Sequence, residues 1–206
     1  LQMTEDAAVV FCTDGAPEEE YWWKKHGSRS AYAKLRQQEA RAALKAVGVE
    51  QVFFLGDYER EPHEFSDQKL FRVLGRAFDE LLAVARSFQP KALVTLSYEG
   101  GHPDHDACGF LAARLGCAAG VPVWEAPLYH RVDGLGHYQE WTCPAGESID
   151  LPITGERLAR KQAMLSQYRS QFTSLPHFRP ELERFRPQAA YDYSQRPHPG
   201  RLNYEE

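Results

Sequence analysis

The residues best suited to chemistry are the two histidines and the aspartate in the sequence EGGHPDH, at residues 99–105. His102, Asp104 and His105 supply two imidazoles and a carboxylate within four positions. One ring can therefore bind a metal while the other donates or accepts a proton in the same cavity. Pro103 suits the first position of a helix, so the group is expected at a helix N-terminus. The plainer alternative is that His102 or Asp104 only caps that helix.

A catalytic zinc usually has three protein ligands and one open position, and this sequence can supply one or two of the ligands. The remaining ligands would have to come from the ends of other strands. We interpret the four other candidate histidines as surface residues and not as ligands: His26, His63, His177 and His198.

Four apolar runs predict the strands of a sheet that is covered on both faces. They lie at residues 7–13, 51–55, 91–97 and 122–126. Residues at helical spacing predict three intervening helices, at 31–47, from a cap at Ser66 or Asp67 to Ala85, and from 107 to a stop at Gly120. This alternation implies right-handed crossovers and therefore an α/β fold, with a Rossmann-like, mostly parallel sheet and helices on both faces.

The chain beyond residue 127 departs from this alternation. We expect a hairpin or edge strand at residues 138–143, a helix that starts at Thr154, and an extended C-terminal tail packed over the domain surface. Open α/β sheets bind ligands at the carboxyl ends of their strands, so three loops should converge: 14–17, 56–62 and 98–105.

Length and composition limit the classes of protein that this chain can be. Its 206 residues are expected to form a single domain over residues 1–206, and the 43% hydrophobic and 26% charged fractions are typical of globular proteins. No apolar stretch is long enough for a membrane span, and the net charge of −5 is a poor match for nucleic acid. The four cysteines form no C-x-x-C pair, so we expect reduced thiols and a cytoplasmic protein.

Several motifs occur in an order that resembles a known family. They are Thr13-Asp14-Gly15-Ala16, the R-x-x-E of Arg36 and Glu39, LKAVGV at 44–49, Phe54-Leu55-Gly56 and EGGHPDH at 99–105. Together they resemble the zinc-dependent de-N-acetylases of the PIG-L/LmbE type, over most of the chain. That family includes deacetylases of N-acetylglucosaminyl-phosphatidylinositol, of mycothiol and bacillithiol precursors, and of some glycopeptide sugars. The resemblance implies a single LmbE-like deacetylase domain.

One motif of the family is absent from this sequence. The A-H-P-D-D-E segment supplies two zinc ligands and a general base in the family, and it would lie upstream of Leu1 together with the first strand. For the residues that are present, the resemblance implies that His105 is the third zinc ligand. It further implies that His102 stabilises the oxyanion or protonates the leaving amine, and that Asp104 is the orienting partner of His102.

Three candidate substrate-binding residues lie in other parts of the chain. Arg36 is a candidate for contacting acetyl or sugar oxygens, and the alternative is a helix-surface ion pair with Glu39. Asp14 and Asp57 follow predicted strands, where they can hydrogen-bond sugar hydroxyls or simply cap loops.

These observations favour a zinc-dependent hydrolase that removes an N-acetyl group from an N-acetylglucosamine-containing or related amino-sugar small molecule. The resemblance implies one Zn²⁺ per chain, with another divalent metal as an open alternative. A second hypothesis, motivated by the missing motif, is a non-catalytic relative that binds a sugar or a partner with an incomplete metal site. A nucleotide-binding Rossmann protein fits the fold alone, but no G-x-G-x-x-G or Walker-type loop follows a predicted strand. The sequence leaves open whether the chain is a monomer or a homo-oligomer.

Overall fold

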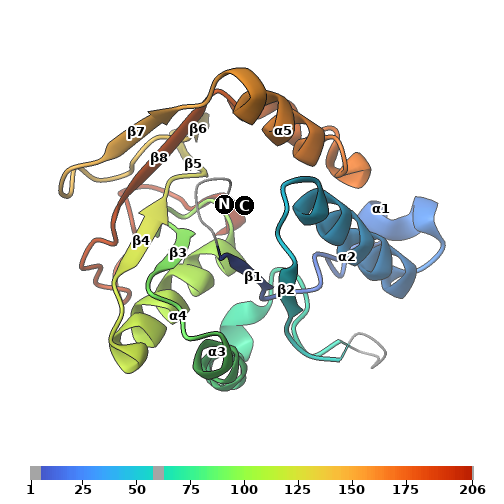
Figure 1. Cartoon of the computed structure of the whole chain (residues 1–206), viewed down its shortest axis with the longest axis horizontal. Helices are drawn as coiled ribbons and strands as arrows, with labels where there is room; N and C mark the ends of the chain where they lie inside the picture. The colour runs from blue at the N-terminus through green and yellow to red at the C-terminus, as the bar shows by residue number, and fades with distance from the viewer. Residues whose placement is uncertain (1–5, 58–62, 206) are drawn as a thin grey trace. The chain divides into compact units, whose positions relative to one another are not determined.

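The computed structural model describes residues 6–57 and 63–205, and its contacts divide the chain into two compact units. Unit 1 comprises Leu1–Val73 and Ile153–Glu181, and unit 2 comprises Leu74–Pro152 and Leu182–Glu206. Figure 1 shows the chain with its elements labelled. Each unit therefore combines two segments that are distant in the sequence. The expectation of a single domain over residues 1–206 stays a prediction.

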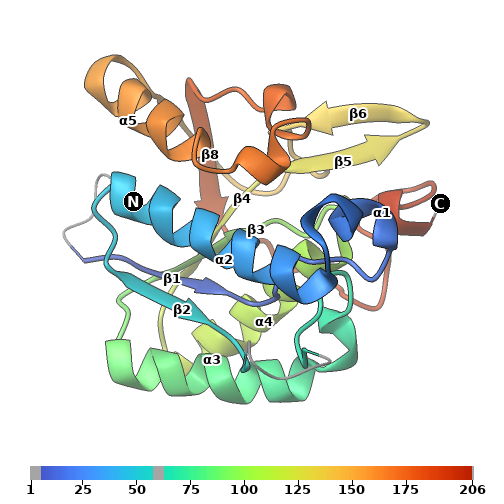
Figure 2. The same cartoon turned by 90° about the vertical axis from the view of Figure 1, so that its right-hand side faces the viewer.

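Unit 1 contains a pair of parallel strands and a set of helices. The strands are β1 (Ala8–Phe11) and β2 (Gln51–Phe54), in register from Ala8 opposite Gln51 to Phe11 opposite Phe54. The α-helices are α1 (Glu20–Trp23), α2 (Arg29–Ala46) and α5 (Gly155–Leu165). Short 3-10 turns lie at Lys24–His26, Leu70–Arg72, Arg169–Gln171 and Leu175–His177. Helix α5 lies beside α2 in both views (Figures 1 and 2).

The long helix α2 forms where the spacing of apolar residues predicts a helix. The Ser28 side chain caps its first turn by accepting a hydrogen bond from the Ala31 N–H at 3.1 Å. The helix ends before Gly48, whose φ of +79° favours glycine. Its buried face carries the apolar residues Tyr32, Ala33, Ala40, Ala43 and Leu44.

Unit 2 contains a four-stranded sheet, a hairpin and two long helices. The sheet has the order β3 (Leu93–Leu96), β4 (Val123–Ala126), β8 (Leu182–Pro187), β7 (Ile149–Pro152). β3 and β4 are parallel, whereas β8 runs antiparallel to both of its neighbours. Helices α3 (Leu74–Phe88) and α4 (Pro103–Ala119) pack against each other, and α4 also packs against β3. A 3-10 turn at Asn203–Glu205 follows near the C-terminus.

The predicted α/β fold is confirmed, with one parallel strand pair in each unit. The four predicted strands appear as β1 to β4, and the three predicted helices appear as α2, α3 and α4. Helix α3 begins at Leu74 and not at the predicted cap of Ser66 or Asp67. The delay has a local reason, because Gln68 has a φ of +63°, which no α-helix accommodates.

Two predictions for the second half of the chain are wrong. The hairpin consists of β5 (Tyr129–Val132) and β6 (Leu135–Tyr138), upstream of the predicted 138–143. Its turn residues Asp133 and Gly134 have φ values of +51° and +79°, as a tight Asp-Gly hairpin turn requires. The tail is also more than a surface cover, because Leu182–Pro187 forms the inner strand β8.

A buried ion pair explains how the arginine-rich segment of β8 lies inside a sheet. Arg186 is 2% exposed and Glu125 of β4 is fully buried, and the Arg186 Nε donates to Glu125 Oε1 at 2.7 Å. The Tyr191 hydroxyl donates to the same oxygen at 2.8 Å, and the guanidinium lies 3.9 Å from the ring centre of Trp141. Buried charges need such partners, so this cluster joins β4 and β8 through side chains as well as through the sheet.

Two further properties of the described residues bear on the sequence-based expectations. None of the described helices combines the length and the apolar character that crossing a membrane requires. No disulfide joins Cys12, Cys108, Cys117 and Cys143 in the part of the chain that the structure describes.

Candidate active site

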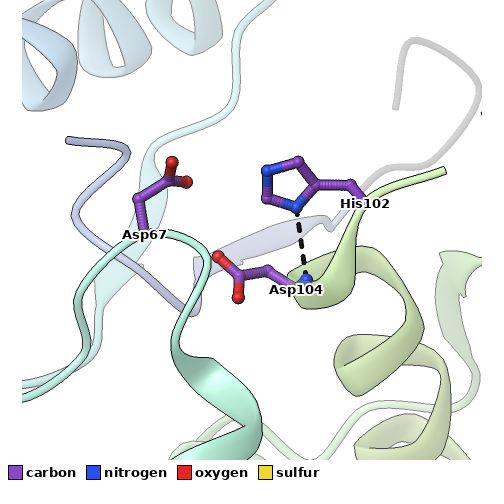
Figure 3. Close-up of side chains that lie close together, drawn as sticks. All are labelled: Asp67, His102 and Asp104. Carbon is purple, nitrogen blue, oxygen red and sulfur yellow. Dashed lines mark hydrogen bonds between the residues drawn. The ribbon is translucent and has the colours of Figure 1, made fainter. Parts of the chain in front are cut away.

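The EGGHPDH sequence folds as a loop that ends in the first turn of α4 (Figure 3). His102 is the N-cap residue, with extended backbone angles of φ −146° and ψ 135°, and Pro103 occupies the first turn. The His102 Nδ1 accepts a hydrogen bond from the Asp104 N–H at 3.2 Å. The capping role foreseen as an alternative is therefore present in the structure.

The cap also determines which ring nitrogen of His102 carries a proton. Because Nδ1 accepts a hydrogen bond, the neutral ring has its proton on Nε2, which is then a donor. Burial lowers the pKa of His102 to about 4, so the neutral ring is the form present near pH 7. The cap thus occupies Nδ1, and the proton of the ring lies on Nε2 at its opposite edge.

His105 lies one helical turn further along and faces the same ring. The ring centres of His102 and His105 are 4.7 Å apart, and those of His105 and Tyr129 are 5.7 Å apart in an edge-to-face arrangement. The Nδ1 of His105 is buried without a hydrogen-bond partner among the described residues. Burial, together with the neighbouring His102, lowers the pKa of His105 to about 3. A neutral imidazole with an unpaired nitrogen is the form that binds a metal, so His105 fits the predicted ligand role.

Asp104 is buried in the first turn of α4, and its backbone N–H is the group that donates to His102 Nδ1. Its side chain is close enough to share a ligand with that ring, since a carboxylate oxygen of Asp104 and a ring nitrogen of His102 lie within 4.8 Å. Figure 3 also draws Asp67, which belongs to unit 1 and whose N–H donates to Asp14 Oδ1 at 3.0 Å. The predicted role of Asp104 as the orienting partner of His102 stays a prediction.

Two buried carboxyl groups support the loop from behind. Glu99 Oε1 accepts from the N–H groups of Leu128 and Tyr129, each at 2.9 Å, and Oε2 accepts from the Ser97 hydroxyl at 3.1 Å. Asp106 Oδ1 accepts from the N–H of Glu99 at 3.0 Å. Burial outweighs these hydrogen bonds and raises the pKa of Glu99 to about 8, and burial also raises the pKa of Asp106.

The second glycine of the loop is required by a close backbone contact. A Cβ atom on Gly101 would lie 1.8 Å from the Tyr129 carbonyl oxygen, a distance that no side chain can tolerate. The loop therefore passes directly against the start of β5. Glu99 binds the same stretch of backbone, so the loop and the start of β5 form one packed unit.

Asp14 lies in unit 1 and its carboxylate is fully engaged. Its Oδ1 accepts from the Ala16 N–H at 3.1 Å, and its Oδ2 accepts from Arg29 Nη2 at 2.7 Å, with no exposed side-chain surface. These contacts are those of the loop-capping alternative. Asp57 is exposed and immediately precedes residues 58–62, which lie outside the described residues. Substrate contacts by both aspartates stay predictions, as does the convergence of the loops at 14–17, 56–62 and 98–105.

Arg36 projects from α2 in unit 1 and shows features of both predicted roles. Its Nη1 is 3.4 Å from Glu39 Oε2, and its guanidinium lies 5.8 Å from the ring centre of Tyr168. Glu39 is engaged more closely by Ser170, whose N–H and hydroxyl donate at 2.8 and 2.6 Å. The Nε of Arg36 is buried without a partner among the described residues, which leaves a donor available near Gly15.

The interpretation of the remaining histidines as surface residues is wrong for two of them. His63 and His198 are each only 6% exposed. His63 Nδ1 accepts from the Phe65 N–H at 3.2 Å, and His198 Nδ1 lies 2.8 Å from the Pro199 carbonyl oxygen. Both rings are packed inside loops. Their neighbours in the sequence are proline-rich or acidic, so the sequence does not indicate that the rings are buried.

Sequence reasoning also missed the residues that hold the loop in place. Glu99 and Asp106 flank the histidine motif, and their acidic side chains gave no sign of complete burial. Asn203 and Tyr204, which contact the loop from the C-terminus, are about a hundred residues away in the sequence. Asn203 and Tyr204 can be identified only from the folded structure, in which they contact the loop.

Comparison with known families agrees with this geometry. Residues 2–115, more than half of the chain, match the PIG-L family model, described as GlcNAc-PI de-N-acetylase. The matched region contains β1, α2, β2, α3, β3 and most of α4, including the complete EGGHPDH loop.

Solved structures of deacetylases share the fold. A deacetylase triple mutant (Orf2*T) of the teicoplanin biosynthetic pathway has a TM-score of 0.65 at 18% identity, covering 90% of this chain and 86% of that one. The A40926 pseudoaglycone deacetylase Dbv21 has a TM-score of 0.62 at 15% identity, covering 90% and 87%. The zinc-inhibited form of teicoplanin deacetylase Orf2 has a TM-score of 0.60 at 17% identity, covering 90% and 88%. At these identities the likeness is one of fold.

Proposed function

Because the chain belongs to the PIG-L family of de-N-acetylases, we propose that it is a metal-dependent hydrolase that removes an N-acetyl group from an amino-sugar small molecule. The substrate class is an N-acetylglucosamine-containing or related conjugate. The observation that carries the proposal is the pair of imidazoles at the N-terminus of α4. One has an unpaired buried nitrogen, and the other has a proton fixed on Nε2.

His105 is the residue of this chain that we assign to the metal, and Zn²⁺ is the proposed ion. When bound, zinc would activate a water molecule and polarise the acetyl carbonyl group. The unpaired Nδ1 and the low pKa of His105 support this assignment, because a neutral imidazole offers one nitrogen lone pair to a metal and, among the described residues, no protein group occupies Nδ1. The similarity in fold to a zinc-inhibited deacetylase gives further support for a zinc-responsive site.

His102 is assigned to the oxyanion that forms when water adds to the acetyl carbonyl. Its Nε2–H is a fixed donor, because the Asp104 N–H occupies Nδ1. Proton donation to the leaving amine would require an imidazolium, and protonation of Nδ1 would break the bond from Asp104. The cap therefore supports the oxyanion role over the proton-donor role. The N-terminus of α4, where His102 lies, adds a partial positive charge that would favour the oxyanion.

Arg36, Asp14 and Asp57 are the proposed substrate contacts. The free buried Nε of Arg36 supports its role, because an unpaired donor beside a glycine is suited to a sugar or acetyl oxygen. Fold similarity to deacetylases of teicoplanin and A40926 pseudoaglycone supports a glycoconjugate substrate. We also propose a cytoplasmic location, on the basis of the free cysteines.

The test is amine release from a panel of N-acetyl sugars by the purified protein, combined with intact mass and metal analysis. The panel comprises N-acetylglucosamine, its inositol conjugates and an N-acylated glycopeptide pseudoaglycone. We expect release that depends on added Zn²⁺ and disappears with a chelator. Binding of these sugars without amine release would instead support a non-catalytic relative.

A further inference from the structure

The C-terminal residues of unit 2 bind the loop that carries His102. We call residues 197–205 the C-terminal clamp; this segment is part of the red stretch near the label C in Figure 2. The Tyr204 hydroxyl donates to Asp106 Oδ2 at 2.7 Å. Asn203 donates twice at 2.9 Å, from its backbone N–H to the Gly100 carbonyl and from Nδ2 to the Gly101 carbonyl. Three hydrogen bonds thus join the clamp to the loop and to the first turn of α4.

The clamp also fits the loop sterically. A Cβ atom on Gly100 would lie 2.7 Å from Leu202 Cδ2 and 3.1 Å from His198 Nε2. Leu202 and His198 are 5% and 6% exposed, so both are packed side chains. The absence of a side chain at Gly100 is therefore what lets the clamp approach.

The clamp is braced by contacts of its own. The Leu202 N–H donates to Glu205 Oε2 at 3.0 Å, and Glu205 pairs with Arg196 at 3.1 Å. Arg196 also donates to the Gly200 carbonyl at 2.7 Å. These bonds close the segment on itself, so the clamp is a folded turn.

A loop with two successive glycines needs such external support. Glycine has more backbone freedom than any other residue, and Gly100 and Gly101 immediately precede the N-cap. The clamp binds the carbonyl groups of both glycines, and Asp106, held by Tyr204, accepts from the Gly100 N–H at 3.2 Å. The next residue along the chain is His102, so the backbone that sets its ring direction is fixed from the C-terminus.

We propose that Asn203 and Tyr204 are positioning residues that hold His102 in its N-cap conformation for deacetylation. This inference rests on the proposed function for its kinetic consequence. Its structural part, restraint of the 99–102 backbone by the clamp, can be measured without any substrate.

The experiment compares three variants of the full chain. Tyr204→Phe removes only the hydroxyl that binds Asp106, and Asn203→Asp replaces the donor to Gly101 with an acceptor of the same shape. Tyr193→Phe is the matched control, because it keeps the ring that packs on Tyr98 and removes a hydroxyl that accepts from Gln188 Nε2 at 3.3 Å. Hydrogen exchange of peptides spanning residues 99–106 and steady-state kinetics are measured for each.

We expect hydrogen exchange at the amides of Glu99 and Gly100 to become about tenfold faster in both variants. Tyr204→Phe releases Asp106, the acceptor of both amides, and Asn203→Asp releases the neighbouring Gly101 peptide. The same variants should lower kcat about tenfold while KM stays close to that of the parent chain. Tyr193→Phe should leave both measurements unchanged.

Two results would overturn the proposal. One is unchanged exchange of the 99–106 peptides in both clamp variants, and the other is an equal change in Tyr193→Phe, which would indicate general loosening. If the parent chain releases no amine from any sugar, the proposed function fails, and the exchange comparison still decides whether the clamp restrains the loop.

Discussion

The loop at residues 99–106 in unit 2 and the Arg36 region of unit 1 each contain residues with proposed roles, and they are built differently. In the loop, main-chain groups are held by buried carboxylates, by the start of β5 and by the C-terminal clamp. Around Arg36, side chains contact side chains, through Glu39, Ser170 and Tyr168. A loop backbone that is held on several sides has one conformation. Side chains that contact one another can be substituted one at a time without changing the backbone. We therefore expect loop changes to affect kcat and stability, and changes around Arg36 to affect KM.

The largest expected effect is that of His105→Ala. Removing the proposed ligand should abolish stoichiometric zinc binding and lower turnover by about a thousandfold or more, because metal polarisation contributes several kcal/mol. Metal analysis of the purified variant and amine release measure the two effects. His177→Ala, at an exposed histidine, is the control and should change neither. Retention of both metal and turnover in His105→Ala would remove His105 from the site.

His102→Ala should retain the metal but lose about a hundredfold in kcat, the usual effect of deleting one oxyanion donor. It should also lose about 1 kcal/mol of unfolding free energy, because the N-cap is lost. His102→Asn separates the two effects, since asparagine caps helices well but cannot place a donor where Nε2 lies. Recovery of stability without recovery of kcat is the expected result, and full kcat in His102→Ala would contradict the assigned role.

Gly101→Ala tests the rigidity of the loop directly. The new methyl group would overlap the Tyr129 carbonyl oxygen, so the unfolding free energy should fall by about 3 kcal/mol. Gly75→Ala in α3 is the matched control, because no heavy atom lies within 4 Å of its Cβ position and alanine favours helices. Urea denaturation of both variants measures the difference. Equal unfolding free energies of Gly101→Ala and Gly75→Ala would mean that the loop backbone can shift to accommodate the methyl group at little cost.

Arg36→Ala should raise KM about tenfold with little change in kcat, as expected when a ground-state contact is lost. The unfolding free energy should change by less than about 1 kcal/mol, because the ion pair with Glu39 is long and partly exposed. Arg41→Ala, on the same helix and stacked on Phe54 at 4.6 Å, is the control and should leave KM unchanged. A fall in kcat alone would place Arg36 with the loop residues and erase the contrast between the regions.

The last expected effect concerns Glu99 and pH. Its folded-state pKa of about 8 lies above the ordinary glutamate pKa of 4.5, so between these pH values the folded state keeps a proton that the unfolded state loses. The contribution of Glu99 to unfolding free energy therefore falls as pH rises through this window, by up to about 1.4 kcal/mol per pH unit. Nearby His130, 3.9 Å away, is neutral there because burial lowers its pKa to about 4.

Glu99→Gln should flatten that slope, because the amide keeps the acceptor for Leu128 and Tyr129 without titrating. Urea denaturation from pH 5 to pH 8 measures the slope in each protein. Glu147→Gln, at an exposed position, should retain the slope of the parent chain. An identical slope in Glu99→Gln would show that the Glu99 carboxyl does not titrate in this window.

The same contrast explains how much could be predicted from the sequence. Apolar runs and helical spacing located β1 to β4 and helices α2 to α4, because burial imposes those patterns locally. The HPDH sequence located the N-terminus of α4 for the same reason, since caps and an N1 proline act within a few residues. Strand β8 was not predicted, because the burial of its Arg186 depends on Glu125, which is 61 residues away in the sequence. The contact of Tyr204 with Asp106 is equally non-local.

The position of β8 late in the chain has a consequence for biosynthesis. The sheet of unit 2 is continuous only when β8 lies between β4 and β7, and unit 1 likewise requires residues 153–181. Strands β3 and β4 therefore leave the ribosome well before their partner is made. Until β8 is synthesised, the carboxylate of Glu125 and the backbone edge of β4 lack their native partners. An unpaired strand edge is prone to pair with the wrong segment. Because β4 and β8 are far apart in the sequence, we expect folding of unit 2 to be slow for its size.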